Sequence, residues 1–170
     1  MKMPFSFADS LQLRLAEYLP IDRPSPESWA VSMCKVGEIP GRREWQLAVD
    51  LFYRLLVCDL VQLWPEGYLG KADAYSFDGP LDFCQALAQQ NPYSFEETSR
   101  RPVPWIGPNI GMTDRLRELL KKHDMVWTKR EDTWPLNEAF IEDIESIFEA
   151  HGVAWSDEPL IPIRGDSAIA

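Results

Sequence analysis

The chain has 170 residues, of which 45% are hydrophobic and 12% aromatic, and its formal net charge is −10. This apolar content is too high for a disordered chain and is enough to build one hydrophobic core. The acidic balance excludes nucleic acid and anionic lipid as ligands held by bulk charge, because both need clustered lysine and arginine. We therefore expect a single globular domain over residues 1–155 and an extended or frayed C-terminal tail over residues 156–170.

Nothing in the sequence suggests export or insertion into a membrane. The longest apolar run, residues 55–64, is interrupted by Asp59 and is far shorter than a membrane span. Three cysteines, Cys34, Cys58 and Cys84, lie far apart in apolar helical patterns, which is typical of free thiols in a reducing compartment. The expected location is the cytoplasm, with no membrane partner.

Apolar residues recur with helical spacing through the first third of the chain. One helix is expected from Asp9 to the residue before Pro20, and a second from Pro26 to Gly37. Residues 42–58 are apolar on most sides of a helix, which is typical of a central element. The helices should therefore pack around residues 42–58.

The rest of the chain predicts shorter elements separated by proline and glycine. In chain order they are a strand at residues 59–64, a helix at 80–89, an ordered loop at 91–112, a helix at 114–123, a strand at 125–128 and a helix at 138–152. The fold class predicted is mainly α, of the α+β kind, a helical domain with a few short strands.

A short apolar segment containing or preceding a tryptophan follows three of these helices. The segments are residues 59–64, 124–127 and 152–155. One explanation is that helix ends resemble one another, and the other is a small sheet that collects all three segments. The sequence leaves both open.

Nearly all of the net charge lies near the end of the chain. Residues 131–170 hold ten acids and one base, Arg164. Within the last helix the acids gather on one side, away from the apolar residues, and no lysine or arginine lies between Glu131 and Arg164. The clustered acids are Glu138, Glu142, Asp143, Glu145 and Glu149. We expect Glu138, Glu142, Glu145 and Glu149 to be exposed. The acids form either an ordinary solvated face or a docking strip for lysine and arginine of another protein.

Two tryptophans are candidate anchors for the same partner. Trp105 and Trp134 lie beside prolines in expected turns, whereas the other tryptophans of the predicted helices and strands fit the core. Tryptophan is enriched among the residues that dominate binding energy at interfaces. We therefore add both to the expected partner-binding set.

The sequence carries no recognisable catalytic or metal-binding motif. His123 and His151 fall in the last turns of expected helices, where they complement the helix dipole. There is no paired Cys/His spacing, phosphate-binding glycine loop or nucleophile elbow. We expect no metal and no cofactor, although a hydrolase that uses two carboxylates remains an alternative.

A small, acidic, tryptophan-rich chain without catalytic motifs resembles the immunity proteins that bacteria pair with contact-delivered toxins, in type VI secretion or contact-dependent inhibition. The resemblance lies in overall character and carries no residue roles. It implies a non-enzymatic cytoplasmic protein that binds a cognate toxin with a basic surface. The alternatives are a small enzyme that uses paired carboxylates, and an adaptor or chaperone for a secreted or assembled protein.

Overall fold

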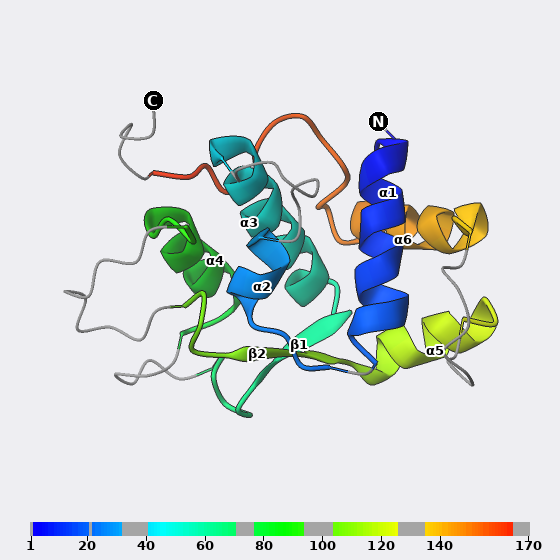
Figure 1. Ribbon diagram of the computed structural model, residues 1–170, viewed down its shortest axis with the longest axis horizontal. Helices are drawn as coiled ribbons and strands as arrows, with labels where there is room; N and C mark the ends of the chain where they lie inside the picture. The colour runs from blue at the N-terminus through cyan, green and yellow to red at the C-terminus, as the bar shows by residue number, and fades with distance from the viewer. Residues whose placement is uncertain are drawn as a thin grey trace.

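The computed structural model describes residues 2–20, 22–31, 41–70, 77–93, 104–125 and 135–164 (Figure 1). It is mainly helical with a two-stranded antiparallel sheet, so the predicted fold class is confirmed. The elements are, in chain order, α1 (Phe5–Gln12), the π-helix η1 (Leu13–Tyr18), α2 (Pro26–Val31), α3 (Arg42–Val57), β1 (Val61–Trp64), α4 (Pro80–Gln89), β2 (Asn109–Met112), α5 (Asp114–Lys122) and α6 (Glu138–Ala150). The expected helix end at Gly37 and most of the expected strand at residues 125–128 lie outside the described residues.

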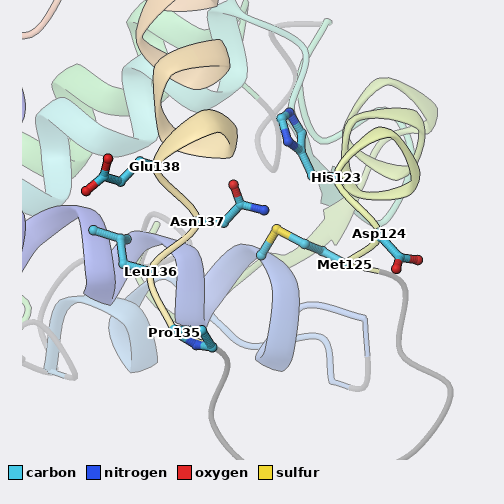
Figure 2. Close-up of a pocket in the computed structure, with 7 residues that line it drawn as sticks. All are labelled: His123, Asp124, Met125, Pro135, Leu136, Asn137 and Glu138. Carbon is cyan, nitrogen blue, oxygen red and sulfur yellow. The ribbon is translucent and has the colours of Figure 1, made fainter.

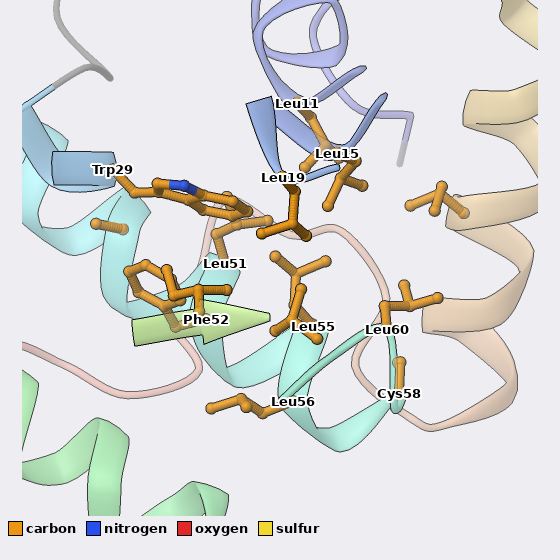
Figure 3. Packing of buried hydrophobic residues seen from close by; sticks show 14 of the residues in the cluster. Leu11, Leu15, Leu19, Trp29, Leu51, Phe52, Leu55, Leu56, Cys58 and Leu60 are labelled. Atoms are coloured by element: carbon orange, nitrogen blue, oxygen red, sulfur yellow. The ribbon is translucent and has the colours of Figure 1, made fainter. Parts of the chain in front are cut away.

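Helix α3 is the centre of the fold. Its first turn is closed by the Glu44 carboxylate, which accepts a hydrogen bond from the Gly41 N–H at 2.9 Å. The helix packs against α2, α4 and β1, and Figure 3 shows leucines of α1 and η1 over the same core. Its buried apolar residues are Trp45, Ala48, Val49, Leu51, Phe52, Leu55 and Leu56. The apolar pattern at residues 42–58 therefore marks the core as predicted.

Strand β2 lies inside the segment expected to be a loop at residues 91–112. It pairs with β1 in antiparallel register, with Val61 opposite Met112 and Trp64 opposite Asn109. A β-carbon added to Gly111 would lie 2.8 Å from the Trp64 indole nitrogen, so glycine is needed for the indole to lie against this strand. A glycine inside a four-residue strand hides the period-2 pattern, which is why the sequence indicated a loop.

Helices α3, α5 and α6 end on the same kind of turn. The residue after each cap has a positive φ, and these residues are Asp59 at 54°, Asp124 at 53° and Gly152 at 71°. The next residue is buried, and its N–H bonds to a carbonyl in the last helical turn; these residues are Leu60, Met125 and Val153. This arrangement is the Schellman motif. All three segments therefore begin as helix endings, and in the described sheet β1 pairs with β2; residues 126–127 of the second segment lie outside the described residues.

After α6 the chain crosses α3 and runs toward α4 (Figure 1). The buried Arg54 side chain holds the start of this segment, donating from Nε to the Val153 carbonyl at 2.9 Å and from Nη2 to the Ala154 carbonyl at 3.0 Å. Farther on, Ile161 is buried, and the Arg164 N–H donates to the Ala88 carbonyl of α4 at 2.8 Å. Residues 156–164 are thus extended and packed on the body, while the boundary expected at residue 155 stays a prediction.

We predict that Asp59→Gly raises the free energy of unfolding by about 0.5–1 kcal/mol, because a residue with a β-carbon is strained in the left-handed conformation. Gly152→Ala should lower it by about 1 kcal/mol for the same reason. Urea denaturation measures both changes. Asp59→Ala is the matched control, since it removes the acid and keeps the β-carbon; if it stabilised as much as glycine, loss of the charge rather than backbone strain would be the cause.

Candidate functional site

Helix α6 presents the acids that the sequence singled out. The Asn137 side chain accepts a hydrogen bond from the Phe140 N–H at 3.1 Å and caps the helix as predicted. Phe140, Ile144 and Phe148 are buried and fix one side of the helix to the core. Figure 1 shows α6 beside α1 and away from α4. We call its outer side the acidic face, defined by Glu138, Glu142, Glu145 and Glu149.

The acidic face is exposed at three of its four positions. Glu138, Glu142 and Glu149 are exposed, as expected. Glu145 is half-buried, because the N-terminal segment packs on it and its Oε1 accepts a hydrogen bond from the Met3 N–H. The expectation of full exposure is therefore wrong for Glu145, which helps to position the N-terminal residues on α6.

Several acids of α6 have cationic partners from distant parts of the chain. Lys2 Nζ lies 3.4 Å from Glu142 Oε1, with both side chains largely in solvent. The flanking acid Asp143 receives Lys122 Nζ at 2.5 Å and His123 Nε2 at 2.7 Å, and the ionised carboxylate requires the proton to be on that histidine nitrogen. These bases come from the N-terminal segment and from the end of α5. They are distant from α6 in the sequence, so the spacing of charges around α6 did not reveal them.

Three acids of α6, Glu138, Glu145 and Glu149, have no ion pair with any residue in the described ranges. Of these, Glu138 and Glu149 are exposed. The five acids of α6 therefore face two lysines, Lys2 and Lys122, among the described residues. The acidic face thus presents two exposed carboxylates that no residue of the described ranges neutralises, a pattern that attracts a cationic surface.

Two shallow hollows lie along the acidic face. One has a volume of about 430 Å³ and is lined by Lys2, Glu142, Glu145, Ser146 and Glu149. The other, of about 250 Å³, adds apolar walls and is lined by Lys2, Met3, Ala8, Leu136, Glu138, Ile141, Glu142 and Glu145. The surface offers carboxylates beside small apolar recesses, and long cationic side chains have the shape and charge to fit there.

A third hollow of about 410 Å³ lies between the end of α5 and the start of α6 (Figure 2). His123 is among the lining residues, but its Nε2 donates to Asp143 and its ring lies edge-on to Phe140 at 5.7 Å. Figure 2 shows the two lining carboxylates, Asp124 and Glu138, at opposite ends of the hollow and pointing apart. Acid–base catalysis by paired carboxylates requires them to converge, and in this hollow they do not.

Of the two expected tryptophan anchors, Trp105 is not part of this surface. Trp105 is fully buried, donates its indole N–H to the Gln90 carbonyl at 2.7 Å, and lies edge-on to Phe52 of α3 at 6.3 Å. Its prediction as an exposed anchor is wrong, because the indole is packed in the core. Trp134 lies outside the described residues.

Sequence reasoning also missed a group of polar residues on one side of α3. Gln46, Asp50 and Arg54 follow one another at four-residue spacing and all bind the main chain of residues 153–163. Burial raises the pKa of the Asp50 carboxyl and lowers the pKa of the Arg54 guanidinium. Charged residues at helical spacing on an otherwise apolar helix were the available signal.

Comparisons with protein-family models, with curated proteins and with solved structures found no match for this chain. Among the described residues, no helix is both long enough and apolar enough to cross a membrane. The same residues contain no group of three or more histidine, cysteine, aspartate or glutamate side chains placed to hold a metal ion. Helix α6, by its geometry and charge, is therefore the candidate site within the described residues.

We predict a small, pH-dependent contribution of Asp143 to stability. Hydrogen bonds from Lys122 and then His123 lower the pKa of this carboxyl, so the folded state binds a proton less readily than the unfolded state. The stabilisation is present above the ordinary pKa of the carboxyl and is lost as the pH falls through the lowered value. Asp143→Asn should cost up to about 1 kcal/mol near pH 7 and progressively less below about pH 4.

Urea denaturation across that pH range makes the measurement. Glu118→Gln is the matched control, because Glu118 pairs with Lys121 within α5 and both side chains are largely exposed. Its effect should be smaller than that of Asp143→Asn. If Asp143→Asn lowered the free energy of unfolding by the same amount at every pH, the contribution of Asp143 would not come from its charge.

Proposed function

We propose that this protein is a non-enzymatic binding protein that neutralises a cognate toxin by docking its acidic face on a basic surface of that toxin. The observation that supports this most is the pair of exposed carboxylates, Glu138 and Glu149, which have no ion pair within the described residues. Like charges at helical spacing disfavour the isolated helix, by roughly 0.2–0.5 kcal/mol per pair. A basic partner offsets that cost in the complex.

The pairing of Glu142 with Lys2 is compatible with this role. Both side chains are largely exposed, and an exposed ion pair is worth about 0–1 kcal/mol. A partner lysine or arginine can displace Lys2 from the carboxylate at little cost. The acidic face then offers Glu138, Glu142 and Glu149 together, spread along three turns of one helix.

Such a surface acts mainly on the speed and register of association. Complementary charge steers two proteins into encounter and can raise association rates by orders of magnitude at low salt. An immunity protein has to capture a toxin before the toxin reaches its target, so a rapid encounter suits the role. The proposed location is the cytoplasm, and the proposed partner is a protein rather than nucleic acid or membrane.

The same face would serve an adaptor or chaperone for a secreted or assembled protein. Purification of the native complex distinguishes the two, because it identifies the partner directly. A toxin with a basic cleft supports the immunity role, whereas a structural component of an assembly supports the adaptor.

We predict that Glu138→Lys with Glu149→Lys slows association with the co-purified partner by about tenfold or more at low salt. It should also flatten the dependence of the association rate on salt, measured at about 50 and 200 mM. The fold should be retained, because exposed substitutions usually change stability by within about 0.5 kcal/mol. Stopped-flow or surface-based kinetics measures the rate.

Glu66→Lys with Asp78→Lys is the matched control. It makes the same change in net charge at two exposed positions in the described segments between β1 and α4, far along the chain from α6. Its association rate should stay near that of the original chain after correction for net charge. Equal slowing by the two double variants would show that overall charge, and not the acidic face, governs binding.

A further inference from the structure

The C-terminal segment is bound to α3 through its main chain. The Gln46 amide donates from Nε2 to the Ile161 carbonyl at 2.9 Å and accepts at Oε1 from the Ile163 N–H at 3.0 Å. One helical turn farther, Asp50 Oδ1 accepts from the N–H groups of Leu160 and Ile161, each at 3.1 Å. Two side chains of one helix therefore bind an extended peptide segment by its backbone.

The sequence of this segment fits that mode of binding. Its backbone donors are the N–H groups of Leu160, Ile161, Ile163 and Arg164. Pro159 precedes the first donor and Pro162 lies between Ile161 and Ile163, so the prolines stand where no N–H is used. Proline also fixes its own φ and favours an extended conformation in the residue before it, which lowers the entropy lost on binding.

Few side chains hold the segment in place. Over residues 156–164, Ile161 is buried at 6% exposure, Leu160 and Ile163 are half-buried against the core, and the other six residues are exposed. Just before it, Val153 and Trp155 are buried and the chain is held by Arg54. Segments with few buried apolar contacts open at lower free energy than the core. The firmly held part thus ends near residue 155 and a lightly held part follows.

We propose that residues 157–164 form a releasable strap, which opens while the rest of the protein stays folded and uncovers a groove on α3 that binds extended peptide through its main chain. The occupant is the chain's own strap. The groove is formed by Gln46, Asp50 and the Ala88 carbonyl at the end of α4. It includes the space that the buried Ile161 side chain fills. This inference is independent of the acidic face and of the proposed toxin partner.

Hydrogen exchange followed by NMR on the full chain tests the opening. The amides of Leu160, Ile161 and Ile163 should exchange at least about 100-fold faster than buried amides of α3, such as that of Leu55. Gln46→Ala should raise strap exchange by a further factor of about 10 and leave α3 unchanged, since it removes two of the hydrogen bonds. Gln62→Ala, at an exposed glutamine of β1, is the control. Strap amides that exchange only with global unfolding would overturn the proposal.

A second experiment tests the groove. Ile161→Asp in the full chain should displace the strap, and a fluorescent peptide of residues 156–164 should then bind in trans, at least about tenfold more tightly than to the original chain. Gln46→Ala should abolish this binding, and so should N-methylation of the peptide at Ile163, which removes one backbone donor. Global unfolding of the Ile161→Asp chain, or peptide binding indifferent to both changes, would show that the segment is an ordinary part of the core.

Discussion

A buried guanidinium joins three helices of this fold. Arg54 of α3 donates to the carbonyls of Val153 and Ala154 just after α6, and its guanidinium lies 5.1 Å from the centre of the Trp155 ring. That ring in turn lies 4.5 Å from Phe7 of α1. A buried charge costs several kcal/mol unless it is paired and hydrogen-bonded, so these contacts have to be kept together. Together with the buried apolar side of α6, this side chain holds the end of α6 against α3 and so helps to set the direction in which its acids face.

The sequence predicted the elements whose ends are set by local chemistry. Proline at the start of α4, Thr113 before α5 and Asn137 before α6 define helix starts without reference to the rest of the fold. Strand β2 was missed because its pairing with β1 depends on a glycine that accommodates the Trp64 indole, and only the folded chain brings the two together. Trp105 was misjudged for a related reason, since proline in a turn indicates a bend but not which way the bend faces.

The sequence also predicted only part of the electrostatics of the acidic face. The clustering of acids on one side of α6 was predicted from spacing alone. The bases that meet Glu142 and Asp143 come from Lys2 and from the end of α5, and their approach depends on how the helices pack. Within the described part of the chain, the face is partly neutralised by Lys2 and partly open. The open carboxylates, Glu138 and Glu149, lie near the two ends of the helix, so a partner that engages both must align with its axis.

Recognition of the last residues by their backbone has a consequence for how this chain can change during evolution. Gln46 and Asp50 contact carbonyl and N–H groups, which every residue except proline supplies in full. The exposed side chain at Arg164 is then free to vary, while a proline at residue 161 or 163 would remove a needed donor. Related chains should therefore conserve Gln46, Asp50 and the spacing of the two prolines more strongly than the identities of the other residues in this segment. An alignment of this region would look variable over a backbone path that stays the same.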